Sequence, residues 1–363
     1  HFAAKYFSPS SWCCQAARKA TQGFASARNC LSMRAARRPA AVTCAAIAVV
    51  AASARHALAM RREPAAASSL AEARRLSPVK LWTLTAAARC VPAPYQPPGL
   101  GDVPGACPDC DGCGDDAFFL GRPTDGTVAI GIADGVGGWR RENVDAGAFS
   151  LELMSNCRDV AEEAADGPEG ASDPKRLLAE AYERLLKKGG PLGSSTACVA
   201  TLDRYTGSVR IANLGDSGAL IIRAGSCALE SSSQQHEFNY PYQLVGPPAV
   251  FKDPKAAKPE MADDYAIDAS DGDIIVLATD GVLDNLHKSD LLEIVTGARD
   301  AAVGEIADRI RHKAWVRSTS YVDTPFVAAA KAGVGRRHIG GKEDDITVVV
   351  ARVQRLPEEQ PDT

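Results

Sequence analysis

Aspartates stand at the ends of apolar segments in four separate parts of this chain of 363 residues. Asp134 follows TVAIGIA, Asp216 follows VRIANLG, Asp280 follows IIVLAT, and the pair Asp344 and Asp345 directly precedes ITVVV. A carboxylate in such a place costs free energy unless it is paired or bound to a cation, and no matching set of Lys or Arg occupies equivalent positions. Carboxylates with few imidazoles or thiolates nearby favour Mg²⁺ or Mn²⁺ over zinc. The pattern predicts an acidic site for two divalent ions.

The competing interpretation is that these aspartates belong to ordinary turns. An Asp-Gly pair is typical of tight turns, and we assign that role to Asp111, Asp125 and Asp271, which lie in polar surroundings. Asp134 and Asp280 also precede glycine, but the segments before them are strongly apolar. We therefore assign these two residues to the metal site.

The elements that must position the aspartates are short strands and a few helices. Runs such as AFFLG from residue 117 and TVAIGIAD up to residue 134 predict strands. Apolar residues at three- and four-residue spacing predict helices over residues 142–164 and 175–188. Gly189 and Gly190 end the second helix.

The second half of the chain is richer in strands. The stretch SSTACVATLDRYTGSVRIANLGDSGALIIRAG predicts three strands joined by tight hairpins in a meander. Residues 225–268 predict surface loops and sheet edges. A buried strand ending at Asp280, a helical segment over 288–316, a glycine-rich loop and a final strand follow. This order predicts an α+β fold with antiparallel sheets rather than alternating βαβ units.

Residues 1–90 differ in composition from the rest of the chain. They hold 14 of the 41 basic residues but only two of the 45 acidic ones. Their Ala, Arg and Ser richness is typical of an organelle transit peptide, and the excess of Arg over Lys favours a mitochondrion over a plastid. The charge-free run over 39–54 is shorter than the roughly 20 residues that span a bilayer, so we expect no stable membrane insertion.

The acidic remainder argues against a nucleic-acid partner, because binding phosphate backbones needs clustered Lys and Arg. Alternating Pro and Gly predict a linker over 91–114. We therefore expect a largely disordered targeting segment over 1–90, a Pro/Gly/Cys-rich linker over 91–114, a folded domain over 115–356 and a disordered tail over 357–363.

The linker carries a cluster of cysteines, CPDCDGC, formed by Cys107, Cys110 and Cys113, with Cys90 upstream as a candidate fourth member. Three interpretations stay open. The thiols are unpaired loop residues, or two of them form a redox disulfide, or the cluster binds a metal ion.

Six stretches of this chain resemble, in order, the motifs of the metal-dependent serine/threonine protein phosphatases of type 2C, and the DGVGGW variant is similar to the organellar branch of that family. The stretches are GDDAFF, IADGVGGW, GSSTACVATL, ANLGDSGALII, VLATDGVLDNL and GGKEDDITVVVARV, and they cover roughly residues 110–355. The resemblance implies a β-sandwich of two antiparallel sheets flanked by α-helices, with the metal ions at one end.

The resemblance also implies roles for individual residues. Asp134 matches the carboxylate that bridges two metal ions, and Gly135 matches the residue whose carbonyl oxygen ligates one of them. Asp280 and Asp344 match the other direct ligands. These three aspartates are therefore the expected catalytic carboxylates.

Further acidic residues match the family's outer metal positions. Asp115 and Asp116 match a pair that acts through metal-bound water, while Asp216 and Asp284 match acids of a third, weaker ion. Asp345 falls where the family has Asn or Asp, and we expect it to cap a strand or support the ligands.

The implied activity is hydrolysis of phosphoserine and phosphothreonine by in-line attack of a hydroxide that bridges two Mg²⁺ or Mn²⁺ ions, without a phosphoenzyme. The implied partner is a phosphoprotein substrate, and we expect a monomer. The alternative is a catalytically weak or silent pseudophosphatase that binds phosphoproteins. A haloacid-dehalogenase phosphatase is excluded because Ala278 replaces its nucleophile, and no calcium loop of the D-x-D-x-D-G type is present.

Two departures from the family pattern motivate the pseudophosphatase alternative. Val136 stands where many members have a His that can protonate the leaving group, and Asp111 stands where many have a phosphate-binding Arg. Four basic residues are candidates to replace that Arg, and the sequence does not choose among them: Arg122, Arg140, Arg141 and Lys342.

Overall fold

Two five-stranded antiparallel sheets form the centre of the structure, a computed structural model that describes residues 81–93, 112–124, 126–163, 173–247, 255–334 and 338–357. The first sheet has the strand order β1 (Trp82–Val91), β14 (Ile346–Arg355), β13 (Ile274–Ala278), β7 (Gly218–Arg223) and β8 (Ser226–Glu230). The second has the order β12 (Asp263–Asp268), β6 (Ser208–Leu214), β5 (Ala197–Asp203), β3 (Thr127–Asp134) and β2 (Asp116–Leu120).

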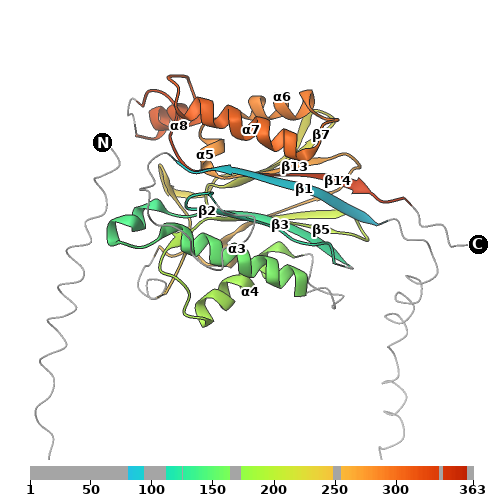
Figure 1. Cartoon of the computed structure of the whole chain (residues 1–363), viewed down its shortest axis with the longest axis horizontal. Coiled ribbons are helices and arrows are strands. Elements are labelled where there is room, and N and C mark those ends of the chain that lie inside the picture. Colours follow the sequence, from blue (N-terminus) through green and yellow to red (C-terminus); the bar gives the residue numbers. More distant parts are fainter. Residues whose placement is uncertain are drawn as a thin grey trace, which may run out of the picture. The chain divides into compact units, whose positions relative to one another are not determined.

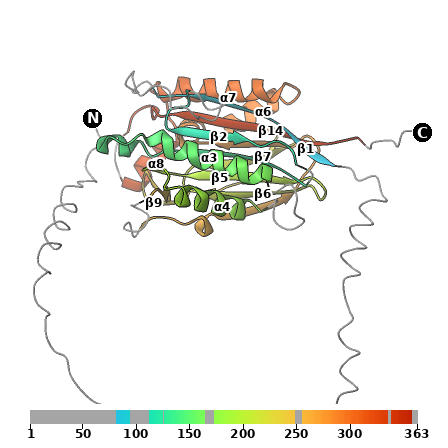
Figure 2. The same ribbon diagram turned by 60° about the horizontal axis from the view of Figure 1, so that its bottom comes forward.

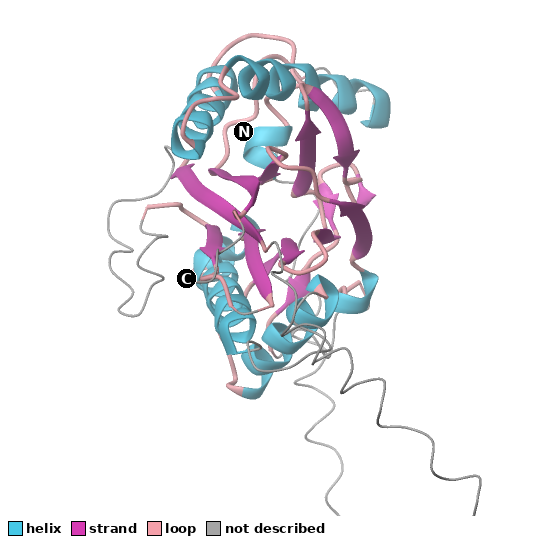
Figure 3. Ribbon diagram, turned by 90° about the vertical axis from the view of Figure 1, so that its right-hand side faces the viewer, coloured by secondary structure: helices cyan, strands magenta, loops and turns pink. Residues whose placement is uncertain are grey.

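Helices cover the outer face of each sheet (Figures 1 and 3). The first sheet is covered by α6 (Lys288–Gly297) and α7 (Val303–Ser318), with α5 (Asp280–Leu283) and α8 (Pro325–Val334) beside them. The second is covered by α3 (Ala146–Glu163) and α4 (Pro174–Lys187), which lie across it in Figure 2. The predicted α+β sandwich flanked by helices is confirmed.

Short strands and 3₁₀ turns complete the fold. The two-residue strands β4 (Ser194–Ser195) and β11 (Leu244–Val245) pair with each other, as do β9 (Gln235–Glu237) and β10 (Tyr240–Pro241). Single 3₁₀ turns form at η2 (Gly137–Glu142) and η5 (Pro259–Met261). Within the described part of the chain, no helix combines the length and apolarity needed to cross a bilayer.

Alternation along β14 shows how the sequence builds the layers. Val348 and Val350 pack into the cluster that contains α7 residues, whereas Val349, Ala351 and Val353 pack against the opposite sheet. Successive side chains of a strand point to opposite faces, so a continuous apolar run buries both faces at once. The strand therefore belongs to two hydrophobic cores, and the start of β14 is held rigidly.

The predicted domain boundary at residue 115 is wrong. Residues 82–91, which we assigned to the targeting segment and the linker, form β1, and this strand pairs with β14 along its full length, from Trp82 opposite Arg355 to Val91 opposite Ile346. The prediction failed because the strand is rich in Ala, and its partner lies some 260 residues later. Residues 1–80, 94–111 and 358–363 lie outside the described residues, so the remaining targeting, linker and tail assignments stay predictions.

The predicted three-strand meander is only half right. β5 and β6 form a hairpin, but β7 belongs to the other sheet. The chain crosses between the sheets at Gly215, whose φ of 102° and whose closeness to Thr196 exclude a side chain. The helical segment over 288–316 divides into α6 and α7, and α8 replaces part of the expected glycine-rich loop.

Candidate active site

The strand ends that carry the aspartates meet at one end of the sandwich. Asp134 ends β3 and lies opposite Asp116, the first residue of β2. Asp280 follows β13, and Asp344 precedes the neighbouring antiparallel strand β14. Asp216 lies in the crossing between β6 and β7. Antiparallel neighbours place the end of one strand beside the start of the next, so five aspartates from distant parts of the chain gather here.

Close backbone packing fixes the turn after β3. The amide of Gly135 donates to the carbonyl of Asp115 at 3.1 Å, and the amide of Thr196 donates to the carbonyl of Asp134 at 3.0 Å. A Cβ atom on Gly135 would lie 2.3 Å from the Asp115 carbonyl oxygen and 2.6 Å from that of Ala146. Only glycine fits at this position, so the Asp134 carboxylate is held in place by backbone contacts on both sides.

Asp134, Asp216 and Asp280 form the centre of the site. Each offers one carboxylate oxygen, and these oxygens lie within 4.8 Å of one another. Among the described residues, the Oδ1 atoms of Asp216 and Asp280 are buried and have no hydrogen-bond partner. Burial and the neighbouring Asp280 raise the pKa of Asp216 to about 7, and burial with the same neighbour also raises the pKa of Asp134. This arrangement fits a hard divalent cation, which would satisfy the unpartnered oxygens.

Lys342 neutralises a second set of carboxylates beside the first. Its Nζ lies 2.9 Å from Asp284 and 3.0 Å from Asp344, and it also contacts Asp280. Burial alone would lower the pKa of Lys342, but the surrounding carboxylates outweigh burial and raise it. Asn285 holds the main chain of Lys342 through two hydrogen bonds of 2.8 and 3.0 Å. The lysine is therefore a fixed internal cation.

The two members of the acid pair at the start of β2 have different partners. Asp115 forms an ion pair of 2.6 Å with Arg140 of η2. Burial raises the pKa of Asp115 to about 7, although Arg140 partly offsets this effect. Asp116 accepts a hydrogen bond of 2.9 Å from the Thr279 hydroxyl, and burial together with the charge of Asp345 raises its pKa.

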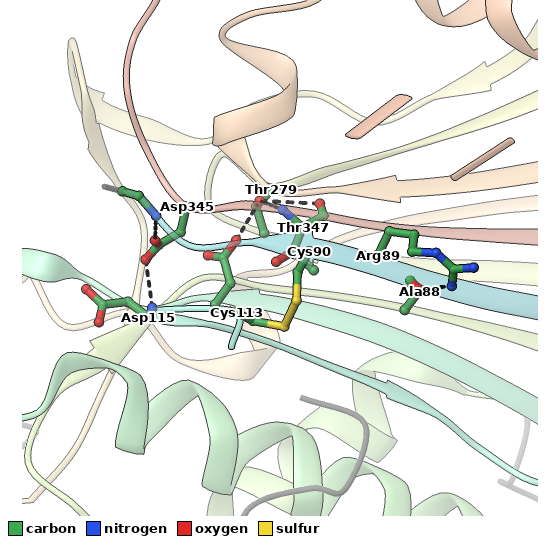
Figure 4. Close-up of a disulfide and its surroundings, with 10 residues drawn as sticks. Ala88, Arg89, Cys90, Cys113, Asp115, Thr279, Asp345 and Thr347 are labelled. Atoms are coloured by element: carbon green, nitrogen blue, oxygen red, sulfur yellow. Dashed lines mark hydrogen bonds between the residues drawn. A yellow bond between two sulfur atoms is a disulfide. The ribbon is translucent and has the colours of Figure 1, made fainter. Parts of the chain in front are cut away.

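Asp345 connects two backbone segments (Figure 4). Its Oδ1 accepts a hydrogen bond of 2.5 Å from the amide of Ala93, and its Oδ2 accepts one of 2.7 Å from the amide of Asp115. The carboxylate thus joins the chain just after β1 to the chain just before β2. Asp345 supports the site through the backbone, in line with the supporting role expected from the sequence.

The expectation that no basic residues match the aspartates is wrong. Two basic residues do accompany the aspartates, namely Lys342 and Arg140. Lys342 contacts residues some 60 positions earlier, and Arg140 contacts one 25 positions earlier, so spacing did not reveal either pairing. The sequence did place both basic residues next to the acidic motifs, because Lys342 lies two residues before Asp344 and Arg140 follows the DGVGGW stretch.

Comparisons with known proteins agree with this geometry. Residues 124–354 match the family model described as stage II sporulation protein E (SpoIIE). The protein phosphatase PTC7 homolog fig of Drosophila virilis is 39% identical over 254 residues, which cover 66% of this chain and 78% of that protein. The homolog of Drosophila mojavensis is 40% identical over 248 residues, with the same coverage.

A solved structure extends the comparison to the fold. The X-ray structure of the photosystem II phosphatase PBCP has a TM-score of 0.62 and a sequence identity of 28%, and the match covers 76% of this chain and 100% of that chain. Together with the family model and the relatives, this likeness shows that the chain belongs to the type 2C family of phosphatases, with a SpoIIE-type domain, and is a protein serine/threonine phosphatase.

Proposed function

We propose that this phosphatase hydrolyses phosphoserine and phosphothreonine with two divalent ions, Mg²⁺ or Mn²⁺, held by Asp134, the Gly135 carbonyl, Asp216, Asp280 and Asp344. The observation that carries the proposal is the group of three carboxylate oxygens within 4.8 Å, in which Asp216 and Asp280 each keep a buried oxygen that has no hydrogen-bond partner among the described residues. When bound, the ions would supply a hydroxide for in-line attack and neutralise charge on the phosphoryl oxygens, so no phosphoenzyme is needed.

The chain's own residues prepare this site in two ways. Backbone hydrogen bonds around Gly135 hold Asp134 in position, and Lys342 holds Asp344 and Asp280 beside it. Like charges held this close repel one another, so Lys342 keeps Asp280 and Asp344 together in the metal-free protein, and an ion that binds there competes with the lysine for these carboxylates. Asp115 and Asp116 are proposed to act through water at the rim of the same centre.

A third, weaker ion at Asp216 and Asp284 would compete with Lys342. Asp284 already accepts the Lys342 ammonium group at 2.9 Å. An ion at that position would have to displace the lysine, which is tied to three carboxylates. Asp280 and Asp344 contact the same lysine, so the two proposed ions meet the same competitor, and calorimetric titration with Mn²⁺ counts the ions that bind.

Arg140 is the best candidate for binding the substrate phosphate. Arg122 pairs with Glu162 of α3 and follows Leu120, at the end of β2 opposite to the site. Lys342 is occupied by its carboxylates, with a side chain only 15% exposed. Arg140 reaches Asp115 with one nitrogen, and its side chain stays 35% exposed, so the rest of its guanidinium can meet a phosphoryl group.

The leaving group requires a proton, and Val136 cannot supply it. We propose that solvent water protonates the seryl or threonyl oxygen, because no His follows the Asp134-Gly135 pair. This feature predicts a modest rate rather than inactivity.

The test is release of phosphate from a phosphothreonine peptide by the full chain, with Mn²⁺, with Mg²⁺ and with a chelator. Asp134→Asn is the inactive control, because it removes a ligand charge with almost no change in volume. Calorimetry on both proteins measures ion binding independently. Ion-dependent release by the wild type, absent in the variant, supports the proposal.

The same experiment decides the alternative function. Wild-type protein that binds Mn²⁺ and a phosphopeptide but releases no phosphate would establish the pseudophosphatase. The absence of His at 136 and of Arg at 111 is the observation that keeps this alternative in view.

The compartment is a separate proposal. The Arg-rich composition of residues 1–80 supports import into an organelle, and we favour the mitochondrion. A plastid is the alternative, and one structural relative is a photosystem II phosphatase. Import of labelled full chain into isolated mitochondria and chloroplasts, followed by protease protection, tests both. Light scattering on the purified chain tests the expected monomer.

A further inference from the structure

A disulfide that the proposed mechanism does not use lies beside the acid pair. Cys90, near the end of β1, is bonded to Cys113, two residues before Asp115. Cys113 is 1% exposed, and Cys90 is half-buried. Figure 4 shows the sulfur–sulfur bond spanning the gap between β1 and the segment that leads to Asp115. One of the three interpretations open at the sequence level, a disulfide, is therefore found, while Cys107 and Cys110 lie outside the described residues.

The disulfide and Asp345 join the same two segments. Ala93 lies three residues after Cys90, and Asp115 lies two residues after Cys113. The amides of Ala93 and Asp115 both donate to the Asp345 carboxylate, at 2.5 and 2.7 Å. One covalent bond and one bridging carboxylate therefore fix the approach to the acid pair.

The backbone around Cys113 passes close to the Asp345 carboxylate. Gly112 and Gly114 have φ values of 90° and 75°, which other residues rarely adopt. A Cβ atom on Gly114 would lie 2.3 Å from the Asp345 carboxylate. Because the backbone passes this close, a shift of Cys113 would move the amide of Asp115 and weaken its bond to Asp345.

The strand β1, which carries Cys90, is a rigid anchor for the disulfide. β1 pairs with β14 over ten residue pairs, and α7 packs against both strands. The disulfide therefore ties a short loop bearing buried carboxylates to a fixed frame. Asp345 repels both carboxylates of the acid pair: after burial, its charge raises the pKa of Asp116, and it also raises the pKa of Asp115. Their close spacing has to be imposed by the backbone.

We propose that the Cys90–Cys113 disulfide is a redox-controlled positioning device, reducible by a dithiol, that holds Asp115 and Asp116 in the geometry that binds divalent ions. This inference rests on the proposed function of the acid cluster. The bond contributes by placement, since neither sulfur touches a reacting atom.

The redox step balances as an exchange of thiols. A thiolate of the dithiol attacks the Sγ of Cys90, the more exposed residue of the pair, and the Cys113 thiolate leaves. The second thiolate of the reductant then attacks its own mixed disulfide and releases the Cys90 thiolate. Two electrons and two protons pass from the dithiol to the two cysteines, and the reductant becomes a cyclic disulfide.

The other described cysteines do not offer the same chemistry. Cys157 and Cys198 are fully buried, and burial raises the pKa of both thiols. A buried thiol without a thiolate form is inert to exchange. Cys227 is part-buried and lies on β8, at the far edge of the first sheet from β1.

The experiment compares oxidised full chain with chain reduced by dithiothreitol and then freed of reductant under argon. Thiol alkylation with mass mapping establishes the state of Cys90 and Cys113. Calorimetry measures the Mn²⁺ dissociation constant, and thermal unfolding in chelator measures stability. We expect reduction to weaken Mn²⁺ binding about tenfold, in the range typical of residues that support metal ligands.

Variants make the test specific. Cys90→Ser with Cys113→Ser should bind Mn²⁺ as the reduced wild type does and should not respond to reductant. Cys107→Ser with Cys110→Ser should keep the full response. If the paired variant fails to fold, reduction of the wild type alone still decides the question.

Two results would overturn the inference. Equal Mn²⁺ affinity in both redox states, with only a lower melting temperature on reduction, would leave the disulfide a purely structural bond. Free Cys90 and Cys113 in air-oxidised protein would remove the device altogether. A redox-dependent Mn²⁺ affinity in a protein that releases no phosphate would instead refute the proposed function and keep this inference.

Discussion

Two groups of carboxylates at the same end of the sandwich differ in whether a basic side chain balances their charge. In the open group, Asp134, Asp216 and Asp280 place oxygens within 4.8 Å, and the Oδ1 atoms of Asp216 and Asp280 have no partner in the described part of the chain. In the lysine group, Asp280, Asp284 and Asp344 surround the Nζ of Lys342. Asp280 belongs to both.

This difference predicts that the two groups contribute differently to ion binding and to the stability of the fold. Buried carboxylates without a counter-charge lower the stability of the folded protein, and a bound cation restores it. Carboxylates around an internal lysine are already neutralised and stabilise the metal-free fold. We therefore expect substitutions of Asp134 and Asp216 to act on ion binding, and substitutions of Lys342 and Asp284 to act on stability. Asp280 and Asp344 are proposed ligands that also contact the lysine, so their substitution should affect both.

The largest effect is expected at the shared residue. Asp280→Asn removes a charge from both groups, so it should lower kcat by roughly 10³-fold or more, the scale of several kcal/mol of lost metal catalysis. Phosphate release with saturating Mn²⁺ measures it. Asp271→Asn, at a surface turn, is the matched control. A variant that keeps more than a tenth of the activity would place Asp280 outside the metal centre.

Removing the internal cation should have the next largest effect. Lys342→Met leaves Asp284 and Asp344 without a counter-charge, which should lower the free energy of unfolding in chelator by about 3 kcal/mol. Mn²⁺ should bind more tightly, because the lysine no longer competes for Asp280. Urea unfolding and calorimetry measure the two quantities. The exposed Lys331→Met of α8 should change neither, and unchanged stability in Lys342→Met would contradict the role of the lysine.

A matched pair of variants compares the groups directly. Asp216→Asn should weaken Mn²⁺ binding and stabilise the metal-free protein by about 1 kcal/mol, because a buried like charge disappears. Asp284→Asn should do the opposite, lowering metal-free stability by about 1–2 kcal/mol with little change in Mn²⁺ affinity. The same two measurements serve both. Equal behaviour of the two variants would abolish the distinction between the groups.

The smallest expected effect is a pH dependence of the metal-free protein. The pKa values of Asp115 and Asp216 are raised to about 7 in the fold, chiefly by burial, so the native state holds their protons more tightly than the unfolded chain does. Stability in chelator should therefore fall as the pH rises from about 4 to 7, by at most about 1.4 kcal/mol per group and pH unit, and should level off above that range.

With Mn²⁺ present the trend should reverse, because protons and ions compete for the same carboxylates. Urea unfolding at three pH values, with chelator and with Mn²⁺, tests both signs. A flat profile in chelator would show that burial does not raise the pKa values of these carboxylates in the folded protein.

Periodic patterns predicted most of the fold. Alternating or continuous apolar runs predicted β3, β5, β6, β13 and β14, and helical spacing predicted α3 and α4 within a few residues. The Ala-rich β1 was not predicted, because alanine carries little strand preference and the strand is defined by β14. The crossing from β6 to β7 was missed for a similar reason: a hairpin and a sheet change look alike when the turn is short.

The sequence by itself determined which side chains can do chemistry. Aspartates at the ends of apolar segments predicted an acidic site, because local hydrophobicity alone makes such charges costly. Only the tertiary structure decided how those charges are balanced. The contacts of Lys342 with Asp280, of Arg140 with Asp115 and of Cys90 with Cys113 join segments that are far apart in the chain, and such contacts depend on strand order and register, which no local pattern encodes.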